Sequence, residues 1–312
     1  MKKLIVSFRL VFALAIALLL VSAKPDNVTL KYNLKVGNTY KLKTTADQTI
    51  EMTMMGQQQN VKNKIEGVIF LKVVAANEKA TTFDTWYDKL KMSIETGMGS
   101  MNMRSDSVQE TNPGSKMLNA MMNKHFTVKM LSNGEITEVS GSEKMMEDAY
   151  SAVTGLDESQ MAMMKESIKQ FGSKDALKGS LETSLRCLPE KPVSIGDSWT
   201  SQVELSSALS ATVNTTWKLS GREAGVATLE GKSILKSKDN GPAQNISGIP
   251  IKYNIKGEQQ ILSKIDEKTG WVIESTINQE ISGEMEMDLT AQGSGIQKAP
   301  LKIKSTTVTS GI

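Results

Sequence analysis

The alternation of apolar and polar side chains between residues 271 and 289 constrains the fold more than any other feature of this chain. Most odd positions are apolar, and the even positions are mainly polar or charged. A period of two indicates an extended strand with one face on an apolar interior and the other in water. At about 3.3 Å per residue the segment is roughly 60 Å long. Such a strand must bend, and Gly283 is the expected site of the bend.

Other segments alternate in the same way. Shared faces are predicted for three groups of side chains: Ile50, Met52 and Met54; Trp86, Leu90, Met92 and Ile94; Ile251, Tyr253 and Ile255. A last strand is expected to begin at Leu301, after Pro300. Residues 68–71 are apolar on both faces, which is typical of a covered strand. The fold class is therefore mainly β (α+β), built from antiparallel strands.

A weak internal repeat divides the chain. Residues 34–40 match residues 193–199: each segment holds an apolar residue, a Gly, an Asn or Asp, a small hydroxyl residue and an aromatic. Later in each half a turn separates two strands, at residues 131–136, with an Asn-Gly pair, and at residues 265–271. We expect two related antiparallel units. They form two curved sheets or half-barrels, or merge into one long curved sheet.

A helical insert is expected between the halves. A first helix follows Ser142 and ends at Gly155, and Asp157 with Gln160 resembles a capping box for a second helix. A third helix carries leucines at helical spacing and stops at Pro189. The predicted division is a β unit with a Met-rich loop at 24–141, the insert at 142–192 and a second β unit at 193–312. Residues 96–124 and 236–248 are expected to be loops.

The first 23 residues are typical of a signal peptide. A basic head precedes an apolar run at residues 10–21, and Val21-Ser22-Ala23 suits signal peptidase. The run is shorter than the roughly 20 residues of a membrane-spanning helix. No Cys follows it to carry a lipid. We expect an exported protein, periplasmic or extracellular in a Gram-negative cell envelope, with no transmembrane span after cleavage.

Charge argues against a nucleic-acid partner. The chain has 37 basic and 34 acidic residues, and three of the basic ones lie in the signal peptide, so the mature chain is nearly neutral. Its three arginines, at positions 104, 186 and 222, are scattered. Nucleic-acid binders usually present a concentrated basic field.

No catalytic or cofactor motif stands out. His125 and Cys187 are the single residues of their types, so the chain cannot form an internal disulfide or a His-based metal cluster. Gly231-Lys232-Ser233 lacks the earlier Gly of a phosphate loop, since position 226 is Val. We predict a protein that is not an enzyme and needs no cofactor. A pair of carboxylates brought together by the fold stays open.

Methionine is unusually frequent. There are 19, and 13 lie between Met92 and Met164. Thioethers bind Cu(I), so Met98, Met101 and Met103 form a candidate copper site. The alternative is that methionine supplies an adaptable apolar surface for the core or a ligand.

Two resemblances accompany these motifs. The turn segments Gly37–Tyr40 and Gly196–Trp199, with Leu188–Val193 before the second, resemble an uncharacterised exported protein family (a domain of unknown function) of Bacteroidetes-type bacteria. That resemblance implies export and a two-part layout and no activity. The long one-faced strands with helices are more loosely similar to lipoprotein-carrier (LolA-like) half-barrels, which is a likeness of fold.

The favoured function is an envelope protein that binds a hydrophobic ligand, such as a lipid, an acyl chain or a lipoprotein segment, on the concave face of a curved sheet. The candidate lining residues are Ile273, Ile277, Ile281, Met285, Met161, Met164 and Phe171. The alternative is a structural or protein-interaction module of the envelope.

Overall fold

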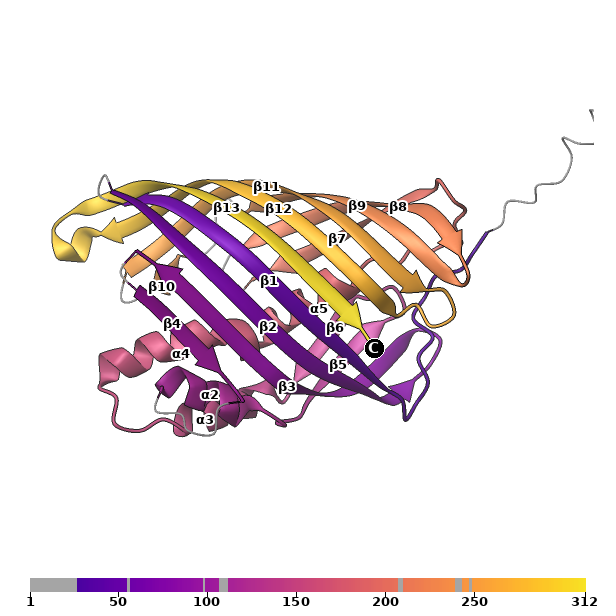
Figure 1. Cartoon of the computed structure of the whole chain (residues 1–312), viewed down its shortest axis with the longest axis horizontal. Coiled ribbons are helices and arrows are strands. Elements are labelled where there is room, and N and C mark those ends of the chain that lie inside the picture. The colour runs from indigo at the N-terminus through magenta and orange to yellow at the C-terminus, as the bar shows by residue number, and fades with distance from the viewer. Residues whose placement is uncertain are drawn as a thin grey trace, which may run out of the picture.

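The structure is a computed structural model that describes residues 27–54, 57–97, 99–106, 112–206, 210–238, 243–246 and 249–312. The signal-peptide prediction lies outside these residues. One antiparallel sheet of 13 strands dominates the fold (Figure 1). Its first strands are β1 (Thr39–Met54), β2 (Gln57–Ala76), β3 (Ala80–Thr96), β4 (Gly99–Arg104), β5 (Phe126–Leu131) and β6 (Ile136–Ser140). The others are β7 (Ser198–Leu205), β8 (Ala211–Glu223), β9 (Val226–Ser237), β10 (Gln244–Ile246), β11 (Ile249–Asp266), β12 (Val272–Leu289) and β13 (Gly295–Gly311).

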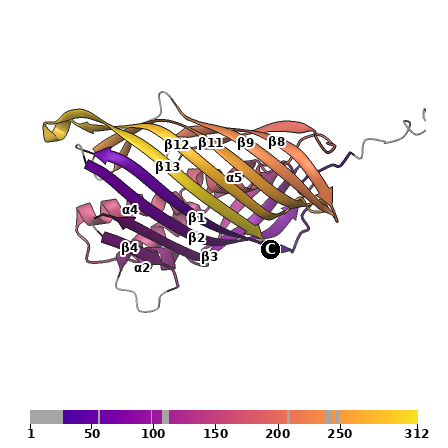
Figure 2. The same cartoon turned by 45° about the horizontal axis from the view of Figure 1, so that its top comes forward.

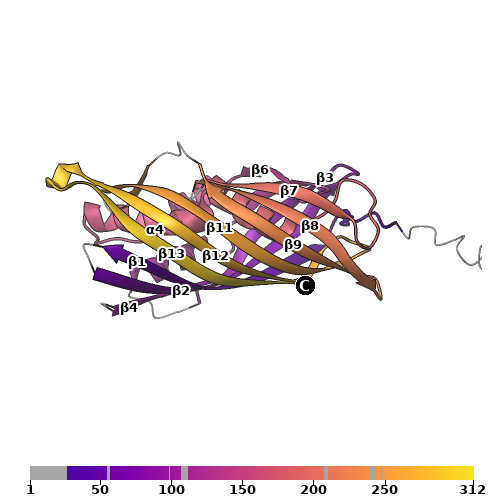
Figure 3. The ribbon, with the colours of Figure 1, turned by 90° about the horizontal axis from the view of Figure 1, so that it is seen from above.

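The sheet is one continuous path from edge to edge. Neighbouring strands follow the order β6-β5-β3-β2-β1-β13-β12-β11-β9-β8-β7, and the short strands β4 and β10 pair with β3 and β11 off this path. Figures 2 and 3 show the long strands curving together around the helices. The mainly β fold class is confirmed, and the two units are merged into a single curved sheet joined where β13 pairs with β1.

The internal repeat corresponds to two equivalent turns. The Gly37 amide donates to Val73 O, and the Val73 amide donates to Asn38 O, each at 2.9 Å. In the second half the Gly196 amide donates to Leu219 O at 2.8 Å, and the Leu219 amide donates to Asp197 O at 3.1 Å. Both glycines have positive φ, +90° and +99°, a backbone conformation that favours glycine. After each turn, the strands follow one another across the sheet in the same direction, from β1 to β6 in the first unit and from β7 to β13 in the second. The two units are therefore arranged head to tail.

Four α-helices lie between β4 and β7 in the chain. They are α2 (Pro113–Met121), α3 (Ser142–Ser151), α4 (Glu158–Gly172) and α5 (Lys174–Leu185), and the 3₁₀ turn η1 (Thr290–Gln292) lies between β12 and β13. Helix α5 contacts β6, β7 and β12, so it bridges the two edge strands of the sheet from inside its curve. The predicted capping box is confirmed: Asp157 accepts from the Gln160 amide at 2.8 Å, and the Gln160 side chain accepts from the Asp157 amide at 3.2 Å.

Several predicted features are wrong in detail. The last strand was expected to begin at Leu301 but begins at Gly295, and residues 236–248, expected to be a loop, contain β10. Residues 96–124 were expected to form a loop, but they contain β4 and α2, whose first turn is capped by Asn112 and begins with Pro113. Ile273 is 38% exposed, because a β-bulge pairs Glu274 with Lys264 and Val272 with Ile265 and leaves Ile273 as the extra residue. A second bulge, at Asp88 of β3, places Trp86 on the opposite face from Leu90.

Candidate ligand site on the inner face of the sheet

The inner face of the sheet is the face that packs on the helices. On six adjacent strands, β9, β11, β12, β13, β1 and β2, every second residue points to this face, and none of these residues is charged. The intervening residues carry the lysines and glutamates. The alternation predicted for 271–289 therefore extends over a large part of the sheet.

The core consists of three clusters along this inner face. The largest joins the helices to the strands at one end and includes Phe83, Leu71 and Ile168. A second cluster, including Leu235, Ile281 and Ile303, and a third, including Met285 and Met287, lie further along the strands. Helices therefore cover one end of the inner face, and strand side chains pack on one another at the other.

A cavity of about 240 Å³ lies between β1–β3 and helices α4 and α5. Its wall is mostly apolar, with a few hydroxyl side chains. The lining residues are Leu42, Thr44, Ala46, Ile65, Gly67, Ile69, Tyr87, Leu90, Phe171, Leu177, Ser180, Leu181 and Ser184. Ser180 is exposed, so the cavity reaches the surface beside α5.

Helix α4 contributes Phe171 from its last turn. The Tyr87 hydroxyl donates to Phe171 O at 2.8 Å, which links β3 to the end of α4 across the cavity. Burial raises the pKa of Tyr87, so this hydroxyl stays protonated and remains a donor. The rest of α4 contacts mainly the other helices.

Helix α5 is tied to the sheet edge by a buried carboxylate. Glu182 is 4% exposed, and its Oε1 accepts from the Ile136 amide at 2.9 Å and from Lys178 Nζ at 3.2 Å. Lys178 Nζ also donates to Ile136 O. One turn later Arg186 pairs with Glu135 at 2.6 Å, and the Tyr32 hydroxyl donates to Leu185 O at 2.7 Å. These contacts fix α5 over the cavity.

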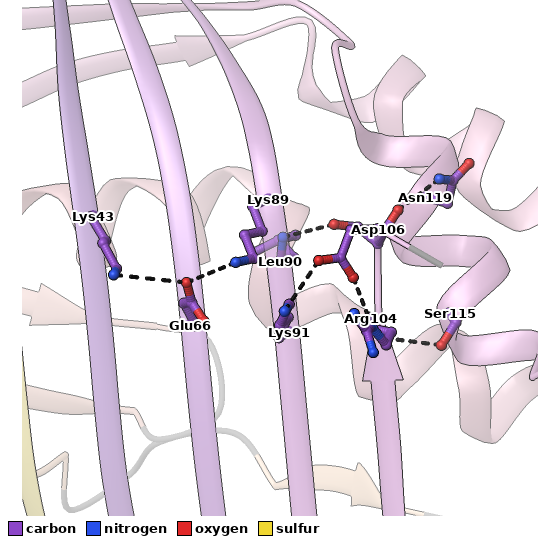
Figure 4. A network of polar contacts seen from close by, with 10 residues as sticks. Lys43, Glu66, Lys89, Leu90, Lys91, Arg104, Asp106, Ser115 and Asn119 are labelled. Carbon is purple, nitrogen blue, oxygen red and sulfur yellow. Dashed lines mark hydrogen bonds and ion pairs between the residues drawn. The ribbon is translucent and has the colours of Figure 1, made fainter. Parts of the chain in front are cut away.

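The outer face carries charge networks. Figure 4 shows one that spans β1, β2, β3 and β4, in which Glu66 lies between Lys43 and Lys89, and Asp106 lies between Lys91 and Arg104. The hydrogen bond from Lys89 lowers the pKa of Glu66, and that from Arg104 lowers the pKa of Asp106 to about 2. The same region holds α2 to the sheet.

The contacts of α2 run through β4. The Arg104 amide donates to Ser115 Oγ at 3.0 Å, and Asn119 Nδ2 donates to Ser105 O at 2.7 Å (Figure 4). Ser105 in turn pairs with Leu90 through two hydrogen bonds of 2.9 Å. The helix is thereby fixed to β3, whose Leu90 side chain lines the cavity.

The predicted lining residues lie in several places. Phe171 lines the cavity. Ile277, Ile281 and Met285 point to the inner face, one in each of the three clusters. Met161 and Met164 of α4 are partly buried against the main cluster, and Ile273 does not face the interior.

Sequence reasoning missed the cavity wall contributed by β1–β3. Alternation in these strands marks Leu42, Ile65 and Ile69 as inward, but nothing local shows that the helical insert covers this part of the sheet. The covered strand at 68–71 was the nearest signal, and Ile69 belongs to it.

The two candidate copper residues that the structure describes, Met101 and Met103, lie in different environments. Met98 lies outside the described residues. Met101 is 40% exposed, whereas Met103 is 1% exposed and packs in the main cluster. Among the described residues there is no group of three or more His, Cys, Asp or Glu side chains that could hold a metal ion.

The single histidine and cysteine have structural contacts. His125 Nδ1 lies 2.8 Å from Asp84 Oδ1, and its ring stacks on Trp86 at the outer face. Cys187 is buried, and burial raises the pKa of its thiol to about 12. No described helix is long and apolar enough to cross a membrane.

Comparison with known proteins adds a family. The model of a family of unknown function, DUF6263, matches residues 78–272. The chain belongs to the DUF6263 family. No curated protein matches it.

Comparison with solved structures gives matches with low TM-scores and low sequence identity. A structure described as "lipid-protein interactions in lipovitellin" matches with a TM-score of 0.48 and 9% identity, over 89% of this chain and 25% of that chain. The outer membrane protein OprG from Pseudomonas aeruginosa matches with a TM-score of 0.25 and 7% identity, over 89% and 97% of the two chains. This chain thus spans about a quarter of the lipovitellin chain.

Proposed function

We propose that this DUF6263 protein is an exported, non-enzymatic protein that binds the apolar chain of a lipid between its curved sheet and its helical insert. The observation that carries this proposal is the cavity of about 240 Å³ lined by Leu42, Leu90, Phe171 and their neighbours. Export, and the loose likeness to lipoprotein carriers, come from the sequence.

The volume of the cavity suits a narrow chain. An engineered apolar cavity of about 150 Å³ binds benzene, and pockets for drug-sized ligands begin at about 300 Å³. The cavity lies between these sizes and opens beside Ser180. An acyl chain is slender enough to enter a cavity of this size through that opening, with its end outside the cavity.

The chemistry of the wall supports binding rather than catalysis. Tyr87 is the one ionisable residue in the described lining of the cavity, and its hydroxyl donates to Phe171 O. Thr44, Ser180 and Ser184 are the candidate nucleophiles on the wall, and among the described residues no histidine, cysteine or carboxylate lines it beside them. Nucleophilic catalysis by serine needs such a base within hydrogen-bond reach.

The test is to fill the cavity from one strand. Ala46→Phe places a large ring in the cavity, whereas Thr45→Phe adds the same ring on the opposite face of β1. The purified mature protein is stripped of lipid and titrated with 1-oleoylglycerol and oleate by native mass spectrometry. We expect binding of at least one probe to the natural sequence and to Thr45→Phe, with a loss of at least about tenfold in Ala46→Phe. Absence of binding, or equal binding by both variants, would contradict the proposal.

A further inference from the structure

A row of uncharged polar side chains crosses the inner face of the sheet between two apolar rows. Its members are paired in register from strand to strand. This polar row consists of Ser201, Thr215, Ser233, Gln259, Gln279, Ser305, Gln48 and Asn63. It spans eight strands, from β7 to β2, so it is a property of the assembled sheet and not of any one segment.

The rows on either side are largely apolar. On the helix side the row contains Trp217, Ile261, Ile277, Ala46 and Ile65. The row on the other side belongs to the second cluster and to Ile50, which packs against it. Its members in the cluster are Val203, Val213, Leu235, Ile281 and Ile303. Polar groups between apolar bands cost free energy unless they are hydrogen-bonded, so their placement needs a partner.

Members of the polar row form some of their hydrogen bonds with one another. Thr215 and Ser233 hydroxyls lie 2.8 Å apart, Gln279 Nε2 donates to Ser305 Oγ at 3.3 Å, and Asn63 Nδ2 donates to Gln48 Oε1 at 3.1 Å. One acceptor atom of the row, Asn63 Oδ1, is buried and has no hydrogen-bond partner. A ligand that supplies an O–H group would complete it.

The polar row is next to the cavity. Ala46 and Ile65 line the cavity, and Gln48 and Asn63 lie two residues further along the same strands. At about 3.3 Å per residue the separation is about 7 Å along the strand. A chain that leaves the cavity in this direction brings its next atoms directly to Gln48 and Asn63.

We infer that the polar row binds the uncharged, hydroxyl-bearing head of a lipid, such as a monoacylglycerol, whose chain occupies the cavity. This inference rests on the proposed function. An anionic head is disfavoured, because the inner face of the six adjacent strands offers no cation to a buried carboxylate or phosphate and an unpaired buried charge is costly. Hydroxyl groups instead match the amide and hydroxyl side chains of the row and can donate to Asn63 Oδ1.

The experiment compares 1-oleoylglycerol with oleate, which share one chain and differ in the head. Dissociation constants are measured at pH 8, where oleate is ionised in solution, by native mass spectrometry of the mature protein. We expect at least about tenfold tighter binding of 1-oleoylglycerol. Gln48→Lys should reverse this preference by placing a cation in the row, whereas Thr49→Lys, on the opposite face of β1, should leave it unchanged.

Asn63→Ala provides a second measurement that adds no buried charge. It should weaken 1-oleoylglycerol binding about fivefold to tenfold, the effect of one hydrogen bond, and leave oleate binding as it is. Equal affinities for the two probes, unchanged by Gln48→Lys and Asn63→Ala, would overturn the inference while leaving the cavity as a chain-binding site. Failure of both probes to bind would instead overturn the proposed function.

Discussion

The two faces of the same strands differ sharply in chemistry. The inner face of β9, β11, β12, β13, β1 and β2 has no charged residue, whereas the outer face carries cross-strand pairs such as Lys304–Glu280 and Lys298–Glu286. Exposed pairs of this kind contribute little to stability, typically below about 1 kcal/mol. The inner face therefore provides the apolar core and the candidate ligand site, whereas the outer face carries paired charges.

A charge placed on the inner face should have the largest effect. Ile281 is 2% exposed, so Ile281→Asp buries an unpaired carboxylate and should lower the free energy of unfolding by at least about 3 kcal/mol. Ser282→Asp, one residue along on the outer face, should change it by less than about 0.5 kcal/mol. Urea unfolding followed by tryptophan emission measures both, and similar losses would show that the two faces are not different.

The second effect concerns the one described charge that is buried. Glu182 accepts hydrogen bonds from the Ile136 amide and from Lys178, so Glu182→Ala should cost about 2 kcal/mol and loosen α5 from the sheet edge. Glu166→Ala removes an exposed ion pair on α4 and should cost less than about 0.5 kcal/mol. Hydrogen exchange of the Ile136 amide distinguishes them: protection that survives Glu182→Ala would contradict the assigned contact.

The bulge in β12 gives a finer test with two neighbouring residues. Val272 is fully buried and Ile273 is 38% exposed. Val272→Ala should therefore destabilise the fold by about 2 kcal/mol, and Ile273→Ala by less than about 0.5 kcal/mol. The reverse order in thermal or urea unfolding would place Ile273 inside, as simple alternation predicts.

A fall in pH should have the smallest effect on the free energy of unfolding, because it protonates carboxylates in ion pairs on the outer face. Glu66 and Asp106 have folded-state pKa values below their ordinary values of 4.5 and 3.8. Their stabilising contribution is therefore present above pH 4.5 and is lost as the pH falls toward about 2, the pKa of Asp106. The double variant Glu66→Gln and Asp106→Asn should flatten the stability–pH curve in that window, and a curve of unchanged slope would show that the network in Figure 4 contributes nothing.

Much of the fold was predictable from local signals. Period-two alternation located β12, the repeated Gly-Asn/Asp turns located the starts of β1 and β7, and the Asp157–Gln160 capping box located α4. The face of the sheet to which an individual side chain points was harder to predict. Ile273 and Trp86 each lie next to a β-bulge, and one extra residue reverses the parity of a strand without any mark in its composition.

The candidate site depends on long-range assembly. Phe171 was predicted as a lining residue from its helical spacing, but its neighbours Leu42, Ile69 and Leu90 come from strands about 80 or more residues earlier in the chain. The polar row was equally hidden, because each of its strands contributes a single Ser, Thr, Asn or Gln residue that looks like an ordinary exception to the alternation. Strand register alone brings them into line.

The most direct measurement is methyl NMR of residues 24–312 with 1-oleoylglycerol, recording nuclear Overhauser contacts between the oleoyl chain and Ile, Leu and Val methyls. The two faces supply matched reporters, Ile65 and Leu90 on the cavity wall and the exposed Ile234 and Leu262 on the outer face. We predict contacts to Ile65 and Leu90 and none to Ile234 or Leu262. Contacts confined to Ile234 and Leu262, or an absence of contacts at Ile65 and Leu90 under saturating probe, would contradict the account.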